Sequence, residues 1–302
     1  MKLKSLLNGI KGLKAKGNLD TDVKGITHNS KNVKEGDMFI AIKGFDTDGH
    51  KYIKDAVENG AKVIVIQEGE TIKKSDIKDD TIVISAPDTR IATSKIACNF
   101  YNNPSSKFTL IGVTGTKGKT TTTFMIKRVL EKAGHKVGLI GTVANYIGDK
   151  NLGESSRTTP ESLELQKLFA DMVEAKIDTV VMEDEGVEYA VMEVSSQSLK
   201  LHRVDDCQFD IGLFTNFSED HISPKEHPDM EDYFNSKLKL FDMCKVGFIN
   251  ADDFNVLKVK KLAKNCDIKT YGIDNAADLL AKDITITNSS VDFKVKIGQK
   301  NE

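Results

Sequence analysis

The chain has 302 residues, enough for two domains that each bury a core of their own. Its 43 lysine and arginine residues nearly balance its 45 aspartate and glutamate residues, and the net charge is −2. This balance excludes the basic signature of a polyanion-binding protein, so no nucleic acid partner is expected. No apolar run approaches the ~20 residues of a membrane span, so no membrane insertion is expected.

The cysteines and the N-terminal segment predict a location in the cell. The four cysteines are far apart, and no pair has the Cys-x-x-Cys spacing; they are Cys98, Cys207, Cys244 and Cys266. This spacing favours structural thiols in a reduced cytoplasmic protein over a zinc or disulfide site. The segment 1–11 is basic but lacks an apolar core of signal-peptide length. We therefore expect a soluble cytoplasmic protein, and a monomer.

Residues 1–88 are predicted to form a small α/β domain. Apolar runs predict its strands, and a short helix ends before Gly60; the strands are expected at 37–42, 62–66 and 81–84, and the helix at 50–59. A further helical stretch at 89–101 leads to Asn103-Pro104-Ser105, which has the composition of a hinge.

A second alternation of strands and helices begins at Phe108, which predicts a second domain over 89–302. Strands are expected at 108–114, 137–142, 189–194, 210–216, 246–250 and 269–273, and helices near 119–133, 160–175 and 231–243. Thr159 and Pro160 have the chemistry of an N-cap and a first helical residue. The alternation predicts an α/β fold with a mostly parallel, doubly wound sheet that binds ligands at the carboxyl ends of its strands.

The segment Thr114–Thr120 joins an apolar strand to a helix through a glycine-rich turn. Its residues suit a nucleotide triphosphate, because backbone N–H groups and the helix N-terminus face phosphates, Lys119 reaches the β and γ oxygens, and the Thr120 hydroxyl binds Mg²⁺. The common spacing would place glycine where Val113 stands. An ordinary turn with a surface lysine is the alternative, and a Gly-Lys-Thr at the helix start favours ATP or GTP binding.

The helix that follows this turn has apolar residues at helical spacing. Ile126, Val129, Leu130 and Ala133 are predicted to face inward, and Lys127, Arg128, Glu131 and Lys132 to face solvent.

Two polar residues follow predicted strands of the second domain. Glu193 ends the apolar run 189–192, where a second contact to Mg²⁺ is needed beside a phosphate loop. His221, with Asp220, follows the strand at 210–216 and could bind metal or polarise a phosphoryl oxygen. A solvated acid and a loop histidine without a role are the alternatives.

Lys237 lies on the apolar face of its predicted helix, beside Tyr233, Phe234, Leu240 and Phe241. Burial there would lower its pKa, and a neutral amine can add CO₂ to become a carbamate. The alternative, favoured by the helix pattern alone, is a lysine whose stem covers apolar surface while its ammonium reaches water.

Two further segments offer groups that could hold an anionic substrate. Arg157, Thr158 and Thr159 combine a cation and two hydroxyls with a helix N-terminus, and Arg203 follows His202. A helix cap and a surface charge are the alternatives. A near repeat of 190–193 at 180–183 leaves open whether both segments are strands.

Together these segments resemble the Mur ligase family, and within it the MurE type. The matching segments run along nearly the whole chain; they are 29–31, 36–44, 48–50, 112–123, 158–160, 193–196, 202–204, 215–216, 220–221, the helix bearing Lys237, and 250–253. The resemblance implies an ATP-dependent ligase of peptidoglycan synthesis. It would phosphorylate the terminal carboxylate of UDP-N-acetylmuramoyl-L-alanyl-D-glutamate, and the amine of meso-diaminopimelate or L-lysine would attack the acyl phosphate.

The resemblance also implies roles for individual residues. The triphosphate would lie on Gly115, Thr116, Lys117, Gly118, Lys119, Thr120 and Thr121, with Asn250 at the adenosine. Mg²⁺ would be surrounded by Thr120, Glu193, His221 and a carbamylated Lys237, and the catalytic residues would be Lys119, Glu193, His221 and Lys237. The UDP-muramoyl dipeptide would be held by Ser30, Thr158, Thr159, Ser195 and Arg203.

The chain departs from the family pattern at several places. Asn29 and Lys31 replace an aspartate and an arginine, Leu201 replaces a polar residue, and segment 180–188 looks inserted. The family's C-terminal domain, which binds the incoming amino acid, has no counterpart within residues 1–302. We therefore expect these residues alone to bind both substrates but to hydrolyse ATP slowly without forming tripeptide.

Two other functions fit the same motifs. One is a related amide ligase, either another Mur-type enzyme or a folylpolyglutamate synthase, although the latter lacks a domain like residues 1–88. The other is a non-catalytic nucleotide-binding module that needs a partner chain.

Overall fold

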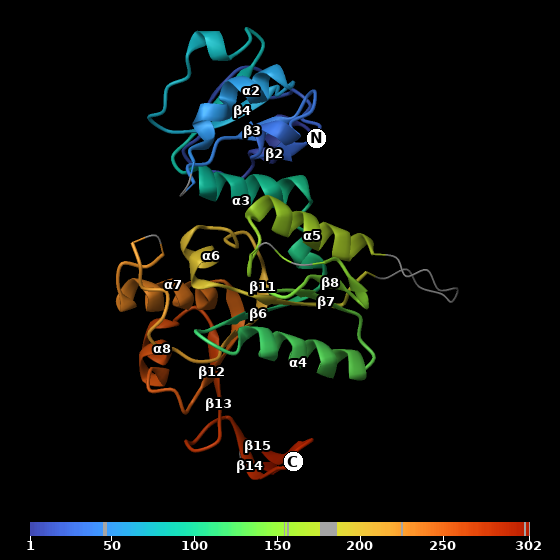
Figure 1. Cartoon of the computed structure of the whole chain (residues 1–302), viewed down its shortest axis with the longest axis vertical. Coiled ribbons are helices and arrows are strands. Elements are labelled where there is room, and N and C mark those ends of the chain that lie inside the picture. The colour runs from blue at the N-terminus through green and yellow to red at the C-terminus, as the bar shows by residue number, and fades with distance from the viewer. Residues whose placement is uncertain are drawn as a thin grey trace, which may run out of the picture. The chain divides into compact units, whose positions relative to one another are not determined.

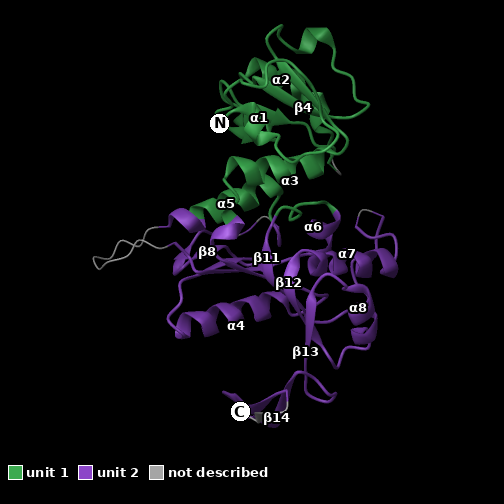
Figure 2. Ribbon diagram, turned by 180° about the vertical axis from the view of Figure 1, so that it is seen from behind, with its two compact units in different colours: residues 1–104, 160–171, 201–206 green, residues 105–159, 172–200, 207–302 purple. Residues whose placement is uncertain are grey.

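The computed structural model describes residues 1–44, 47–153, 155, 157–175, 186–224, 226–298, 300 and 301. Figure 2 shows two compact units: the first comprises 1–104, 160–171 and 201–206, and the second comprises 105–159, 172–200 and 207–302. Both units are α/β, and the mostly parallel α/β fold expected from the sequence is confirmed. No helix within the described ranges is both long and apolar enough to cross a membrane.

The first unit is built on a five-stranded sheet with helices on both faces. The strand order is β1-β5-β4-β3-β2, and only β1 is antiparallel to its neighbour; the strands are β1 (Lys14–Lys16), β2 (Ile26–Thr27), β3 (Met38–Ile40), β4 (Val63–Gln67) and β5 (Ile82–Ala86). Successive residues of a strand face opposite sides. Met38 therefore packs with α1 (Leu3–Leu6) and α3 (Thr89–Phe100), and Phe39 packs with α2 (Ile53–Glu58).

Helix α3 lies just after the predicted boundary between the two domains. The sequence placed that limit at residue 88, but Ala92 and Ile96 of α3 are buried in the core of the first unit. A helix that covers a sheet face contributes to the same core as the sheet. The limits 1–88 and 89–302 themselves stay a prediction.

The second unit is built around β6, which lies between β10 and β11 at the centre of a mostly parallel sheet (Figure 1). The strand order is β16-β15-β14-β13-β12-β11-β6-β10-β7-β8-β9, with antiparallel pairs only toward the two edges. The strands are β6 (Thr109–Thr114), β7 (Val137–Ile140), β8 (Tyr146–Ile147), β9 (Lys150–Asn151), β10 (Tyr189–Glu193), β11 (Phe209–Phe214), β12 (Cys244–Asn250), β13 (Asp267–Gly272), β14 (Leu279–Ile286), β15 (Val291–Ile297) and β16 (Lys300–Asn301). All six strands predicted for this region are present.

The remaining helices are α4 (Lys119–Lys132), α5 (Ser162–Glu174), α6 (Ser196–Lys200), α7 (Met230–Asp242) and α8 (Val256–Leu262). The predicted N-cap of α5 is wrong, because the helix begins at Ser162 rather than at Pro160. Thr159 instead uses its hydroxyl in the site described below. Of the near repeat, the second copy is β10, and residues 180–183 lie outside the described residues.

The buried face of α4 differs from the predicted one. Val129 is 68% exposed, although it was predicted to face inward, and Lys127 is only 8% exposed. The Lys127 ammonium pairs with Glu131 and lies 5.5 Å from the centroid of the Tyr146 ring. Carboxylate and aromatic partners allow this lysine to occupy the inward stripe. The helix was predicted correctly, and so was the inward position of Ile126 and Leu130, which pack on the core; the exposed Val129 and the buried Lys127 were not.

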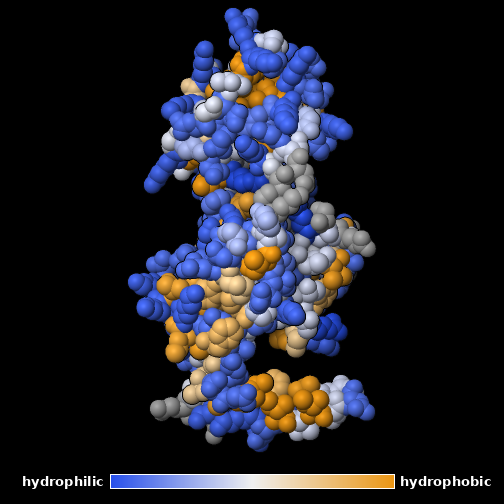
Figure 3. All heavy atoms as spheres, turned by 60° about the vertical axis from the view of Figure 1, so that its left-hand side comes forward, coloured by the Kyte–Doolittle hydropathy of each residue, from blue (hydrophilic) through white to orange (hydrophobic). Residues whose placement is uncertain are grey.

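A hairpin near the end of the described chain was not predicted. β14 and β15 are antiparallel and joined by a turn in which Thr287 and Ser290 exchange hydrogen bonds. Apolar residues alternate along β15, and Figure 3 shows apolar atoms gathered on the hairpin at the lower end of the view. Val291 is 56% and Phe293 54% exposed. The alternation along β15 is the period-two pattern of a strand, and the sequence prediction overlooked it.

Two phenylalanines of the second unit provide a matched test of its core. Phe241 on α7 is fully buried, and its ring lies 6.3 Å from that of Phe214. Phe254 is 83% exposed. We expect Phe241→Ala to lower the free energy of unfolding by about 3–5 kcal/mol, and Phe254→Ala to change it by about 0.5 kcal/mol or less. Urea unfolding checks both, and equal effects would contradict this core.

Candidate functional site

The turn between β6 and α4 requires glycine at two positions. Gly115 and Gly118 have φ of 143° and 83°, in the region that disfavours other residues. A Cβ at Gly115 would lie 2.0 Å from the Thr215 hydroxyl oxygen. The backbone of the turn therefore approaches the end of β11 more closely than a side chain allows.

Asn216, the second residue after β11, fixes the conformation of this turn. Its backbone oxygen accepts from the Thr116 N–H at 2.9 Å, and its Oδ1 accepts from the Lys117 N–H at 3.0 Å. The N–H groups of the first turn of α4 have no partner within the helix, and the helix dipole makes this end positive. An anion would therefore meet the N–H groups at Lys119 and Thr120, while those of Thr116 and Lys117 hold the turn in shape.

The Lys119 side chain lies over this turn. Its ammonium donates to the backbone oxygens of Gly115 at 2.9 Å and Thr116 at 3.1 Å. Burial lowers the pKa of Lys119, and Glu193 and Asp220 oppose this effect. A cation that is partly desolvated and held only by neutral carbonyls gains most from an incoming phosphate.

Glu193, at the carboxyl end of β10, lies beside the turn as the sequence predicted. Its side chain is 1% exposed. The Thr120 hydroxyl lies 3.0 Å from both carboxylate oxygens, and Thr142 donates its N–H at 2.9 Å and its hydroxyl at 3.1 Å. A Cβ at Gly141 would come within 2.4 Å of Oε1. Strands β6, β7 and β10 are neighbours, so their ends bring these groups together.

Hydroxyl groups continue from Glu193 toward the segment before α5. The Thr158 hydroxyl oxygen lies 3.1 Å from that of Thr142. The Thr159 hydroxyl donates to the backbone oxygen of Glu193 at 2.9 Å and accepts from the Ser195 N–H at 3.1 Å. Thr159 therefore holds the segment before α5 against the end of β10 instead of capping a helix. Three of the predicted substrate residues, Thr158, Thr159 and Ser195, gather here.

Lys237 is buried in the second unit, with 1% of its surface exposed. Its ammonium donates to the Gly115 oxygen at 2.8 Å and lies 4.4 Å from the centroid of the Tyr233 ring. Burial, with the charge of Lys119 second, lowers the pKa of Lys237 to about 6. The buried face predicted for this lysine is confirmed, and its ammonium does not reach water.

His221 does not join the group around Glu193. Its ring is 44% exposed, and its Nδ1 lies 3.0 Å from a carboxylate oxygen of Glu226. Within the described part of the chain, no hydrogen bond or ion pair links it to Glu193, Thr120 or Lys237. Its φ is 57°, a left-handed conformation that is uncommon for residues other than glycine.

The described residues contain no group of three or more histidine, cysteine, aspartate and glutamate side chains that could hold a metal ion. At the turn, Glu193 supplies one carboxylate and Thr120 supplies one hydroxyl. These hard oxygen donors fit Mg²⁺, which usually keeps several waters and takes only one or two protein carboxylates.

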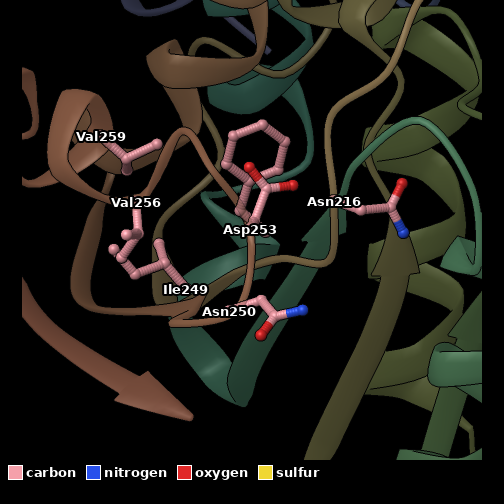
Figure 4. A pocket seen from close by; sticks show the side chains of 7 residues that line it. Asn216, Ile249, Asn250, Asp253, Val256 and Val259 are labelled. Carbon is pink, nitrogen blue, oxygen red and sulfur yellow. The ribbon is translucent and has the colours of Figure 1, made fainter. Parts of the chain in front are cut away.

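Asn250 ends β12 and contributes to a small, mostly apolar pocket (Figure 4). The pocket lies at the carboxyl ends of β11 and β12, and its lining residues are Phe214, Asn216, Ile249, Asn250, Asp253, Val256 and Val259. Asn216 therefore takes part both in the turn and in this pocket.

Ser30 and Arg203 belong to the first unit. Ser30 is 8% exposed in a short 3-10 helix, and its backbone oxygen accepts from the Asn59 side chain at 3.0 Å. Arg203 is 3% exposed and pairs with Glu161 at 2.9 Å, which also lies 3.7 Å from Arg90. The surface-charge alternative for Arg203 is therefore wrong.

Comparison with known protein families agrees with this two-unit α/β fold. The family model described as the Mur ligase middle domain matches residues 113–302, and the family model described as the Mur ligase family, catalytic domain, matches residues 22–101. The chain belongs to the Mur ligase family.

The chain is similar to curated ligases of this family. It is 46% identical over 305 residues to the UDP-N-acetylmuramoyl-L-alanyl-D-glutamate–2,6-diaminopimelate ligase of Caldanaerobacter subterraneus subsp. tengcongensis, covering 100% of the chain and 59% of that protein. It is 48% identical over 272 residues to the ligase of the same name from Clostridium botulinum, covering 90% and 53%. The chain thus spans little more than half the length of these relatives.

A solved structure shares the fold. A UDP-N-acetylmuramoyl-L-alanyl-D-glutamate–2,6-diaminopimelate ligase superposes with a TM-score of 0.78 at 22% identity, over 100% of this chain and 58% of that one.

Several residues of this Mur ligase site were missed from the sequence. Thr142 supplies two of the hydrogen bonds to Glu193, and the Tyr233 hydroxyl donates to the Thr116 hydroxyl at 3.2 Å. The fully buried ring of His227 lies between Ser196, at 2.9 Å from Nε2, and Asp232, at 2.6 Å from Nδ1. Thr142 follows Gly141 at the end of a predicted strand, and this position was the only feature of the sequence that could have indicated a role in the site.

His227 makes the stability of the second unit depend on pH. Burial lowers the pKa of His227 below its ordinary value of 6.5, and Asp232 opposes this effect. The unfolded chain therefore takes up the proton first, and acidification below about 6.5 favours unfolding. We expect His227→Gln to reduce the loss of unfolding free energy between about pH 7 and about pH 5, by at most about 1.4 kcal/mol per pH unit.

Urea unfolding of both proteins across that range measures the two slopes. His135→Gln serves as the control, because it removes a histidine whose side chain is 36% exposed. Parallel slopes for wild type and His227→Gln would contradict the assignment.

Proposed function

We propose that this chain is the substrate- and ATP-binding part of an ATP-dependent amide ligase of peptidoglycan synthesis. The enzyme adds a diamino acid to the terminal carboxylate of UDP-N-acetylmuramoyl-L-alanyl-D-glutamate. The observation that carries the proposal is the position of the buried Glu193. Its carboxylate accepts a hydrogen bond from Thr120, which follows the glycine-rich turn, and its backbone oxygen accepts one from the Thr159 hydroxyl. The names of the relatives favour 2,6-diaminopimelate over lysine as the amine.

ATP is proposed to bind across the turn and the pocket of Figure 4. The triphosphate would contact the backbone from Gly115 to Thr121 and the Lys119 ammonium, and Asn250 would lie at the adenosine. The apolar lining of the pocket suits a base, and Asn250 and Asp253 offer hydrogen bonds at its rim.

A magnesium ion is proposed to be held by Thr120 and Glu193. When bound, it supplies charge that neutralises the phosphate oxygens. His221 would need its loop to move to join this group, since its ring bonds Glu226. The other donor would be Lys237 as a carbamate.

Lys237 has the properties that carbamate formation requires. With a pKa of about 6, its amine is largely neutral at neutral pH and can attack CO₂. The carbamate would be an anion in a buried place, so a metal and Lys119 would stabilise it. The Gly115 oxygen, which now accepts from the Lys237 amine, would remain beside a carbamate N–H.

The acceptor carboxylate is proposed to lie beside Thr158, Thr159 and Ser195, near the γ-phosphate position. The dipeptide carboxylate attacks that phosphorus, ADP leaves, and the amine then displaces phosphate from the acyl phosphate. Ser30 and Arg203 are proposed to bind the UDP-muramoyl part. Domain limits of 1–88 and 89–302, and a cytoplasmic location with free thiols, complete the proposal.

The test is ATP-dependent ligation by the natural polypeptide that contains this chain. With UDP-N-acetylmuramoyl-L-alanyl-D-glutamate and diaminopimelate or lysine, we expect tripeptide and ADP in equal amounts. Lys119→Ala should lose ATP binding and at least about 100-fold of activity, because it removes the only ammonium that reaches into the turn from α4. Lys132→Ala is the matched control, since its exposed side chain lies at the other end of the same helix, away from the turn.

Mass spectrometry of the product and titration of nucleotide binding provide the measurements. Hydrolysis of ATP with no amide product would contradict the ligase and favour a nucleotide-binding module. Glutamate addition to a folate would favour the related ligase instead. Unchanged nucleotide affinity in Lys119→Ala would contradict the phosphate site.

The carbamate is tested at Lys237. Lys237→Ala should lose at least about 100-fold of the ligase activity and regain part of it with added short carboxylates, which replace the missing anion. Lys239→Ala, two residues along the same helix, should retain activity. Native mass spectrometry in CO₂-containing buffer should show the added mass of CO₂ on wild type only. A plain amine at Lys237 beside bound Mg²⁺ would contradict the carbamate.

A further inference from the structure

Two of the four cysteines lie with their sulfur atoms next to each other. Cys244 is the first residue of β12, and Cys266 directly precedes β13. Their Sγ atoms are 3.2 Å apart, although the residues are 22 positions apart in the chain. Nothing in the proposed ligase chemistry uses either thiol.

The two cysteines lie where two paired strands begin. β12 and β13 are parallel neighbours, with Val246 opposite Asp267, which sets Cys266 one position away from the level of Cys244. The chain before β13 is outside the regular ladder, and its Cys266 sulfur lies against that of Cys244, within reach of a disulfide. The Asn265 side chain donates to Asp242 at 3.2 Å and holds the incoming chain at the same place.

The surroundings of the two thiols differ. Cys244 is 6% exposed, and a Cβ at Gly212 would lie 2.8 Å from its sulfur, so it is packed against β11. Cys266 is partly exposed. A small oxidant in solution therefore reaches Cys266 first, and Cys244 lies behind it as the second sulfur.

We propose that Cys244 and Cys266 form a dithiol modification site, which hydroperoxides convert to a reversible disulfide. Cys98 and Cys207, which are buried, serve as internal controls. The proposal does not depend on the ligase activity.

The reaction balances with one hydroperoxide for each disulfide. The Cys266 thiolate attacks a peroxide oxygen, the O–O bond breaks, and Cys266 becomes a sulfenic acid while the leaving oxygen takes a proton. The Cys244 thiol then loses its proton as its sulfur attacks the Cys266 sulfur, the S–O bond breaks, and the leaving hydroxide takes a proton to become water. The two sulfurs lose two electrons in total, and the peroxide gains them.

The disulfide would close a loop that carries part of the nucleotide pocket. Residues 245–265 include Asn250, Asp253 and Val256, which line the pocket of Figure 4. Closing this loop restricts the unfolded chain and joins the start of β12 to the start of β13. Oxidation should therefore make this segment more resistant to proteolysis.

Peptide mass mapping of the natural polypeptide, alkylated after treatment with hydrogen peroxide, tests the proposal without any variant. We expect a peptide that links Cys244 to Cys266, with the loss of two hydrogen atoms, which dithiothreitol reverses. Alkylation of Cys98 and Cys207 should be unchanged. Sulfinic acid at Cys266 with no cross-link, or a cross-link to another cysteine, would overturn the proposal.

Cysteine variants and the pH dependence of cross-link formation distinguish this site from unspecific oxidation of cysteines. Cys266→Ser should abolish the cross-link, and Cys98→Ser should retain it in full. Burial raises the pKa of Cys266, so the thiolate fraction is small at neutral pH. Cross-link formation should thus accelerate with pH, by up to about tenfold per pH unit. A rate independent of pH would overturn attack by the thiolate.

Discussion

The hydrogen bonds that the Glu193 carboxylate receives are the constraint on which the rest of the site depends. A carboxylate that is 1% exposed is costly unless hydrogen bonds compensate for lost water, and here Thr120 and Thr142 supply them. These groups come from the ends of three adjacent strands and the helix that follows one of them. The parallel order β6-β10-β7 therefore places the Glu193 acid beside the turn that follows β6, and Thr142 beside the acid.

The Gly115 backbone oxygen is a second point of convergence, because both Lys119 and Lys237 donate to it. Burial lowers the pKa of Lys237, and the charge of Lys119 on the same acceptor lowers it further. The same geometry leaves room for added negative charge, whether from a phosphate at Lys119 or from a carbamate at Lys237. The turn is thus built to receive anions before any is bound.

Contacts with distant segments also explain why several polar residues have roles other than those that their local sequence predicts. Thr159 looks like a helix cap in the sequence, yet its hydroxyl joins Glu193 to Ser195. Arg203 looks like a surface charge, yet it is buried on Glu161. In each case a partner from a distant segment forms a hydrogen bond or ion pair that the local sequence does not contain.

The sequence by itself determined the order of the main strands and helices, the glycine requirement at Gly115 and Gly118, and the buried face that carries Lys237. These features are local, because side-chain periodicity and backbone sterics act over a few residues. Only the tertiary structure decided that Thr142 meets Glu193, 51 positions away, that His221 bonds Glu226 instead of the acid, and that Lys127 rather than Val129 faces inward. Those outcomes and the Cys244–Cys266 pair depend on which strands become neighbours and on partners from other segments. No local pattern in the chain encodes that choice.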